Sequence, residues 1–181
     1  MSVNDIKVLR HGGGVFRWAV DDRTTTGVAR TIKAGEPVYC TPGNSAYAFR
    51  GEDGTPKIAT DIVLGIASRE STETSSANGE VEFISIIPGQ TVLEGVATTK
   101  GNIDSAAELI TYRGNYVLFD ASYTKYSTTD GAITIDENDT DDPNVNGLCI
   151  IDGSADADGL VRVIVHANVL FGGALVGQTM D

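Results

Sequence analysis

The sequence predicts an all-β fold, a small barrel or a sandwich, and three observations support this. Short runs of apolar and β-branched residues recur along the chain, and clusters of Gly, Pro, Asn, Asp and Ser separate them. One run, residues 160–169, alternates strictly: its valines face one way, while Arg162 and two other polar residues face the other. The preceding Asp158–Gly159 pair is typical of a hairpin turn, because both residue types tolerate positive φ.

The predicted strands each combine β-branched or aromatic residues with a flanking polar or glycine turn. In order, they are residues 37–40, 46–49, 61–68, 79–87, 91–98, 115–120, 132–136, 147–152 and 160–169. The helical candidate is segment 102–110, where Asp104 or Ser105 would cap a turn or two before Leu109 and Ile110. Because the segment is short, we expect it to be peripheral.

The length and composition are those of a globular protein. A chain of 181 residues, 41% of them hydrophobic, can build one good core or two small ones. No run approaches the roughly 18 apolar residues that a membrane-spanning helix needs, so we expect no membrane partner. The first 14 residues lack the apolar stretch of a secretory signal, so we expect no Sec-type export and a protein that is made in the cytoplasm. Cys40 and Cys149 lie in apolar runs and are predicted to be buried, reduced thiols, with a disulfide as the alternative.

Charge divides the chain. Residues 1–33 hold six basic and three acidic residues, whereas the remainder holds seven and 22, within a net charge of -12. We therefore predict a basic N-terminal arm over residues 1–33, a domain over 34–172 and a C-terminal tail over 173–181. So acidic a domain repels phosphate backbones, which argues against nucleic-acid binding.

The arm is either a solvated tail or a docking segment. The docking interpretation rests on Phe16, Arg17 and Trp18, because Trp and Arg are favoured as interface anchors and this is the only Trp of the chain. Lys7 and Arg10 would then meet an acidic partner surface.

The acidic loops raise the alternatives of a cation site and of plain turns. An EF-hand frame placed on residues 154–165 puts Val165 where the last glutamate ligand belongs, which favours a turn. Segments 136–142 and 152–158 leave cation binding open, although the first reads as a solvated loop excursion. We predict no metal and no cofactor.

The sequence also argues against an enzyme. Its histidines are His11, beside three glycines, and His166, on a strand face, so neither is placed as a base beside a nucleophile. No phosphate-binding or dinucleotide-binding glycine motif is present. We predict a structural role for His166.

Two parts of the chain share one plan. Segments beginning at Gly65 and Gly147 both run from an apolar strand through a polar loop ending in Asn-Gly or Asp-Gly to a longer alternating strand. Upstream, segments beginning at Lys33 and Tyr112 each offer a glycine turn and a hydrophobic strand. We interpret these as two related β units; the alternative is the general likeness of hairpins.

The order of these pieces resembles a known family. "GEPVY", "GIA", "GEVEF", "EGVAT", "GNYVLFD", "GAITID", "GLCIID" and "GLVRVIVH" follow one another across residues 33–170. This series resembles the head decoration, or capsid cement, proteins of tailed phages, related in fold to the lambda-type decoration protein. The resemblance rests on the spacing of glycines and strands. It implies a β-tulip or small barrel, usually three copies around local threefold axes of the capsid. The long excursion over residues 121–144 and the 33-residue lead-in depart from the usual compact form.

If the resemblance holds, the chain binds the outside of an expanded capsid in the virion. It would clamp neighbouring copies of the major capsid protein against the pressure of the packaged DNA. The alternative is a surface β module, a capsid fibre or adhesin-like domain, with Tyr123 and Tyr126 stacking on a host glycan or packing at a subunit interface. A tail or neck component remains a third interpretation.

Overall fold

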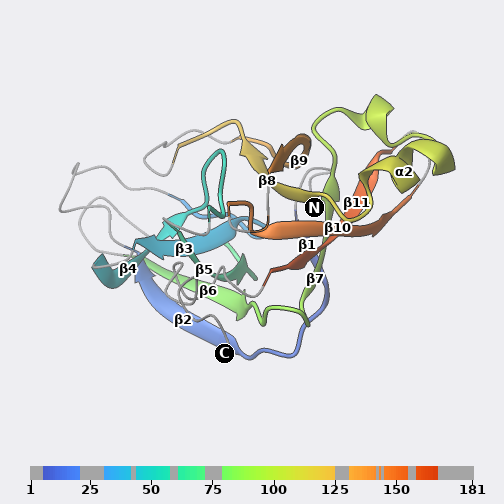
Figure 1. The fold of residues 1–181 in the computed structure, drawn as a ribbon. Coiled ribbons are helices and arrows are strands. Elements are labelled where there is room, and N and C mark those ends of the chain that lie inside the picture. The colour runs from blue at the N-terminus through green and yellow to red at the C-terminus, as the bar shows by residue number, and fades with distance from the viewer. Residues whose placement is uncertain are drawn as a thin grey trace.

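The computed structural model describes residues 6–20, 31–41, 44–57, 61–71, 79–124, 131–141, 143, 145–154 and 158–166. Within these residues the chain forms eleven strands, one short α-helix and a single 3-10 turn (Figure 1). The strands are β1 (Lys7–Arg10), β2 (Val15–Val20), β3 (Pro37–Thr41), β4 (Asn44–Arg50), β5 (Ile62–Ala67), β6 (Gly79–Ser85), β7 (Val92–Val96), β8 (Tyr116–Ala121), β9 (Ile133–Asp141), β10 (Leu148–Gly153) and β11 (Leu160–Val165). The helical elements are η1 (Lys100–Asn102) and α2 (Ala106–Tyr112). The prediction of an all-β fold is confirmed.

The strands form a closed barrel and a second sheet. The barrel has the order β2-β4-β3-β5-β6, and the six-stranded sheet has the order β1-β7-β11-β10-β8-β9. Figure 1 shows the barrel strands at the lower left and most of the second sheet above them and to the right. Named strands pair antiparallel, except β2 and β4, whose parallel bridge at Val20 and Ala48 closes the barrel.

The two halves share one strand order. Starting from β3 and from β8, the orders β4-β3-β5-β6-β2 and β9-β8-β10-β11-β7 are equivalent strand by strand. A glycine with positive φ precedes each starting strand, at Gly35 and Gly114. The Gly35 N–H donates to the Ala67 carbonyl on β5, and the Gly114 N–H donates to the Ile150 carbonyl on β10, each over 2.8 Å. β5 and β10 are equivalent strands in the two orders. We therefore describe the barrel as the first unit and strands β7 to β11 as the second unit.

The ladders correct one detail of the sequence comparison. Pro37 pairs with Ile66 in the first unit, and Tyr116 pairs with Cys149 in the second. The equivalent of Gly65 is therefore Leu148, the residue after Gly147. The sequence comparison, which aligned Gly65 with Gly147, is one position out of register.

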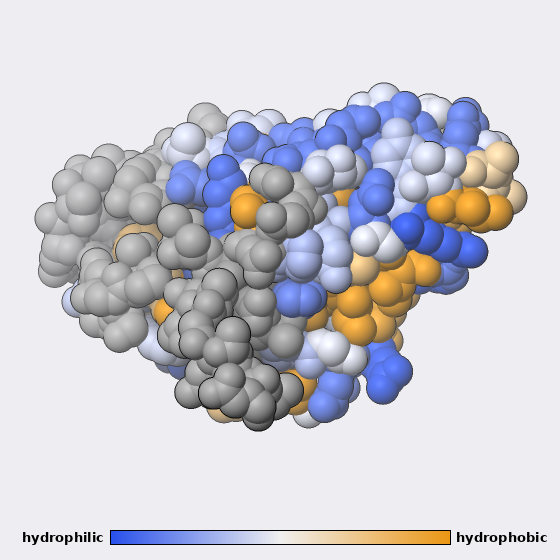
Figure 2. All heavy atoms as spheres, in the orientation of Figure 1, coloured by the Kyte–Doolittle hydropathy of each residue, from blue (hydrophilic) through white to orange (hydrophobic). Residues whose placement is uncertain are grey.

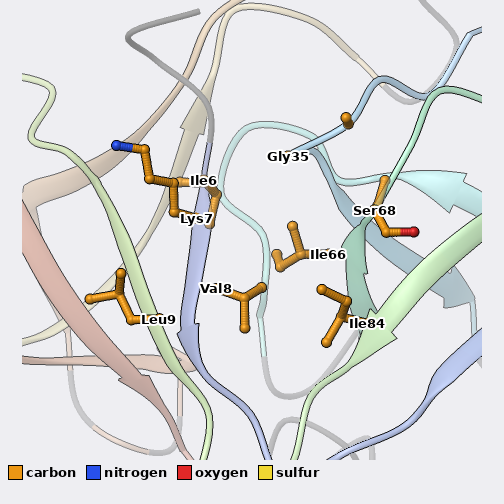
Figure 3. A pocket seen from close by; sticks show the side chains of 10 residues that line it. Ile6, Lys7, Val8, Leu9, Gly35, Ile66, Ser68 and Ile84 are labelled. Carbon is orange, nitrogen blue, oxygen red and sulfur yellow. The ribbon is translucent and has the colours of Figure 1, made fainter. Parts of the chain in front are cut away.

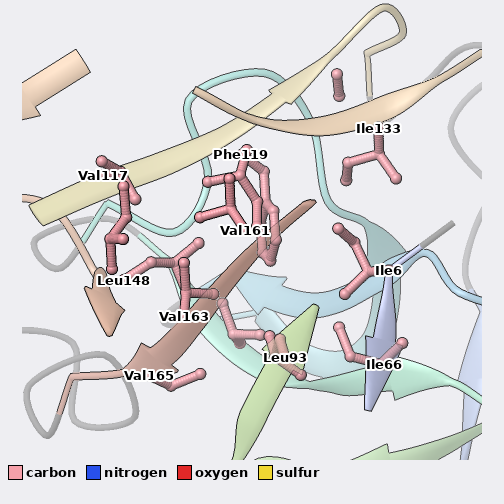
Figure 4. Close-up of a cluster of buried hydrophobic side chains, with 14 of the residues drawn as sticks. Ile6, Ile66, Leu93, Val117, Phe119, Ile133, Leu148, Val161, Val163 and Val165 are labelled. Carbon is pink, nitrogen blue, oxygen red and sulfur yellow. The ribbon is translucent and has the colours of Figure 1, made fainter. Parts of the chain in front are cut away.

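Two clusters of buried side chains hold the structure together. The smaller fills the barrel and includes Val38, Val81 and Phe83. The larger joins the outer wall of the barrel to the second sheet (Figure 4). Its members include Ile66 from the barrel and Phe119 from the sheet. Full burial of one such side chain contributes about 1.5–3 kcal/mol, so this joint is a major source of stability.

The N-terminal segment differs from the prediction of an extended arm. β1 pairs with β7 in the second sheet, and β2 pairs along its whole length with β6 in the barrel. The physical reason is the alternation within β2, where Trp18 and Val20 join the barrel cluster while Arg17 lies exposed. The segment over residues 6–20 is therefore part of the fold. Residues 1–5, 21–30 and 173–181, which belong to the predicted arm and tail, lie outside the described residues.

The helix prediction is confirmed. Ser105 is the N-cap of α2: its hydroxyl accepts the Glu108 N–H at 3.3 Å and donates to the Glu108 carboxylate at 2.7 Å. The first of these bonds satisfies the Glu108 N–H, one of the backbone groups that a helix leaves open at its N-terminus. Leu109 is the buried residue of the helix, which makes α2 peripheral, as expected.

Candidate functional site

The five residues predicted to bind a partner lie on two different sheets. Lys7 and Arg10 are on β1, whereas Phe16, Arg17 and Trp18 are on β2. The Phe16 ring is 53% exposed and stacks on the Phe83 ring in the barrel, with centroids 6.2 Å apart. Trp18 packs against the barrel cluster. The structure therefore does not bring these side chains together into one patch.

Arg17 belongs to a row of charges on the outside of the barrel. Its Nε lies 3.1 Å from Glu82 Oε2, and its Nη1 lies 3.6 Å from Glu80 Oε1. Arg69, just after β5, lies 3.3 Å from the same Glu82 oxygen. The hydrogen bond from the Ser68 hydroxyl is the largest cause that lowers the pKa of Glu82. The hydrogen bond from Arg17 and the charge of Arg69 lower it further. Because its carboxylate is protonated only at low pH, Glu82 stays ionised near neutrality.

A second row lies on the outside of the second sheet. Arg162 on β11 reaches Glu94 on β7 at 3.0 Å and Asp152 on β10 at 3.4 Å. Arg113 contacts Asp152 at 2.6 Å, and Lys7 contacts Glu94 at 3.9 Å. The hydrogen bond from Arg113 is the main cause that lowers the pKa of Asp152. Of these residues only Lys7 was predicted from the sequence as a binding residue, although the alternation over residues 160–169 indicated an outward side chain for Arg162.

An apolar groove lies between β1 and the barrel. It has a volume of about 390 Å³, and Figure 3 shows Val8 facing Ile66 and Ile84 across it. Leu9, 48% exposed, and Lys7 also line it. Lys7 is the charged residue of the lining, so the groove offers apolar contact and has no acid–base pair.

A buried ion pair lies below the surface of the barrel. Arg50 Nη2 is 2.6 Å from Glu36 Oε1, and Arg50 Nε is 2.9 Å from Glu36 Oε2, a bidentate arrangement. The guanidinium lies 3.7 Å above the centre of the Tyr123 ring. Burial raises the pKa of Glu36, and Arg50 opposes that shift. Both partners are almost fully buried, so the pair is structural.

Tyr123 is therefore in a different place from the one expected of a glycan-binding residue. Its side chain is 4% exposed and covered by Arg50, which leaves no face for a sugar ring. Tyr126 lies outside the described residues.

The acidic segment 136–142 also differs from the expectation of a solvated loop. Residues up to Asp141 belong to β9, and Glu137 is fully buried. The Glu137 carboxylate accepts N–H groups from Thr99 at 3.3 Å, Asn102 at 2.9 Å and Asn138 at 2.7 Å. These three donors satisfy the buried carboxylate within the chain. Among the described residues, no group of three His, Cys, Asp or Glu is arranged to hold a metal ion.

The remaining candidates for chemistry have structural surroundings. His166 packs edge-on against Tyr116, with ring centroids 5.4 Å apart. The exposed His11 contacts the Gly13 carbonyl at 3.0 Å. Cys40 is buried and Cys149 half-buried; both are free thiols, and burial raises the pKa of each. A raised pKa keeps these thiols protonated and weakly reactive near neutrality.

Comparison with known proteins gives no assignment. No protein family, curated protein or solved structure matches the chain. Among the described residues, no helix is long and apolar enough to cross a membrane.

Proposed function

We propose that this protein is a decoration protein that binds the outside of an expanded tailed-phage capsid. The observation that carries the proposal is the repeated unit. The segments on which the family resemblance rests fall on β3 and on β5 to β11, and the two units to which these strands belong have equal strand order. Such a duplicated β-domain, with paired charge rows on its surface and a structural buried ion pair, suits a lattice-binding protein.

The mechanism is mechanical. A protein that binds only the expanded shell stabilises that state by linkage, by an amount that grows with its free concentration relative to its Kd. Two units in one chain offer two related surfaces, so neighbouring major capsid subunits can be held at once. Binding at two points gains avidity without strong individual contacts. A trimer around a local threefold axis would multiply these points further.

The docking surface we propose centres on the connection between β1 and β2. Leu9 and Phe16 flank this connection and are 48% and 53% exposed. Arg10, also exposed, lies between them in the chain and would meet acidic groups of the shell. Lys7, Arg17 and Trp18 lie further along β1 and β2, in ion pairs or against the barrel cluster, and are not part of this surface. Phenylalanine and arginine are both enriched at protein interfaces, which suits Phe16 and Arg10 to this role.

The structure also determines how this surface is tested. Deleting residues 1–20 would remove β1 and β2 and open the barrel, so point substitutions are needed. We expect the double variant Leu9→Ser, Phe16→Ser to bind purified expanded shells at least about tenfold more weakly than the wild type in a co-sedimentation assay, since an anchor contributes more than about 1 kcal/mol. The wild type should not bind immature shells.

The matched control is Ile110→Ser on α2, where an equally apolar side chain is 64% exposed on another part of the surface. This variant should bind like the wild type. Equal binding by the Leu9, Phe16 variant, with an unchanged melting temperature, would exclude this docking surface. Equal binding of the wild type to immature and expanded shells would contradict the mechanism.

A glycan-binding surface module is the alternative function. The burial of Tyr123 removes one of the two residues on which that interpretation was based.

A further inference from the structure

Equivalent positions of the two units carry rows of charge with opposite signs. The β2 row lies on β2, on β6 and just after β5; its residues are Arg17, Glu82 and Arg69. The β7 row lies on β7, β11 and β10; its residues are Glu94, Arg162 and Asp152. These strands correspond one to one in the two units. The β2 row therefore reads plus, minus, plus, and the β7 row reads minus, plus, minus.

The strand ladders place the rows in equivalent surroundings. Within β2 and β6, Arg17 is directly opposite Glu82, and within β7 and β11, Glu94 is directly opposite Arg162. Beside each row, two positions along, lies a cross-strand pair of one valine and one isoleucine. The pairs are Val15 with Ile84 and Val92 with Ile164. The two faces thus match in their apolar pair and differ in the sign of their charges.

Both rows reach the surface through their arginines and Asp152, whereas the side chains of Glu82 and Glu94 are 20% and 10% exposed. The side chains of Arg17 and Arg69 are 57% and 54% exposed, and those of Arg162 and Asp152 are 39% and 43% exposed. Figure 2 shows hydrophobic side chains gathered over β7 and β10 with charged groups around them. Ile151 on β10, next to Asp152, is 40% exposed. A second molecule would find apolar area and a charge pattern together on this face.

We propose that the β2 row of one molecule docks on the β7 row of a second copy of the chain. In that contact each charge faces its opposite, whereas two identical faces would bring like charges together. The apolar pairs supply the buried area, and the charge rows set register and orientation. The contact joins two different faces, so it is heterologous and makes a closed ring when the rotation between copies closes.

This self-association needs no capsid. It can fail while shell binding by single molecules stands, and it can hold when shell binding fails. The wild type is expected to self-associate in sedimentation equilibrium, and its dissociation constant should rise at least about tenfold between 20 mM and 500 mM salt, because salt shortens the Debye length from about 20 Å to a few Å. A wild type that stays monomeric at about 1 mM in low salt would overturn the proposal.

The decisive variant inverts the β2 row together with its neighbour Glu80. It carries Arg17→Glu, Glu80→Arg, Glu82→Arg and Arg69→Glu, which keeps opposite charges in contact within the molecule and leaves the net charge unchanged. Both faces then have the same sign pattern. We expect the dissociation constant for self-association to rise at least tenfold while the melting temperature stays close to that of the wild type. Association as tight as that of the wild type would overturn the proposal.

Two further variants separate the effect of charge sign on self-association from other effects of the substitutions. The control Lys100→Glu, Asp139→Lys changes two exposed residues outside both rows with no net charge change, and it should associate like the wild type. A second variant adds the inversion of the β7 row to the first. It carries Glu94→Arg, Arg162→Glu and Asp152→Arg, with Lys7→Glu and Arg113→Glu to preserve the flanking pairs. The faces are complementary again, so association should return. A folded protein that stays monomeric would contradict the proposal.

Discussion

Replacing Arg50 by methionine is expected to destabilise the fold by about 3–5 kcal/mol, because it leaves the Glu36 carboxylate buried without its partner. Both oxygens of that carboxylate bind the guanidinium, and the side chain of Glu36 is only 6% exposed. The loss should be smaller at low pH. Burial already raises the pKa of Glu36, and removing Arg50 removes the main opposing influence. The folded state then takes up a proton more readily than the unfolded state, so falling pH restores stability. Urea unfolding at several pH values measures both effects.

Two matched variants make this prediction specific. Arg69→Met removes an arginine of an exposed ion pair and should cost less than about 1 kcal/mol. The double variant Glu36→Gln, Arg50→Met removes the buried charge as well, and it should be more stable than Arg50→Met alone. A free energy of unfolding for Arg50→Met within about 1 kcal/mol of the wild type would show that the pair is not the structural centre we describe.

Replacing Glu137 by alanine is expected to cost about 3 kcal/mol, since three N–H donors lose a charged acceptor. The donors come from Thr99, Asn102 and the neighbouring Asn138, so the carboxylate ties β9 to the η1 turn across the sheet. Hydrogen exchange of the η1 amides should accelerate more than that of the barrel strands.

The control for this prediction is Asp139→Ala, two residues along the same strand. Asp139 is exposed, so its replacement should change the free energy of unfolding by less than about 0.5 kcal/mol. Equal effects of the two substitutions would mean that Glu137 is as solvated as the sequence suggested.

The sequence predicted those parts of the fold whose signals are local. The Asp158–Gly159 turn precedes β11, and Gly159 has a φ of 61°. The alternation over residues 160–165 directly gave the buried and half-buried sides of that strand. The resemblance between halves was also visible, because glycine turns and strand lengths repeat at similar spacing.

The parts that were not predicted depend on distant partners. β2 pairs with β6, whose residues lie 59 to 69 positions later, and a run of six residues gives no sign of such a partner. The acidic composition of β9 argues against a strand, but pairing with β8 and burial of Glu137 outweigh that local preference.

The candidate site was predicted only in outline. Arg17 is exposed as expected, but Trp18 packs against the barrel cluster. Its ladder equivalent in the second unit is Gly95, where a side chain would meet Ile6 and Ile135. Ile6, the residue before β1, thus occupies in the second unit the space that Trp18 occupies in the first. This difference depends on how the folded units pack, so the sequence of neither unit indicates it.

The most direct test of the decoration role is the abundance of this chain in particles. A lysate from infected cells is separated on a density gradient into immature, empty expanded and DNA-filled particles, and quantitative mass spectrometry compares the chain with the major capsid protein in each. We expect near-stoichiometric amounts in the expanded and filled particles and almost none in the immature ones. A few copies per particle, equal amounts in immature and expanded particles, or absence from all of them, would contradict the role.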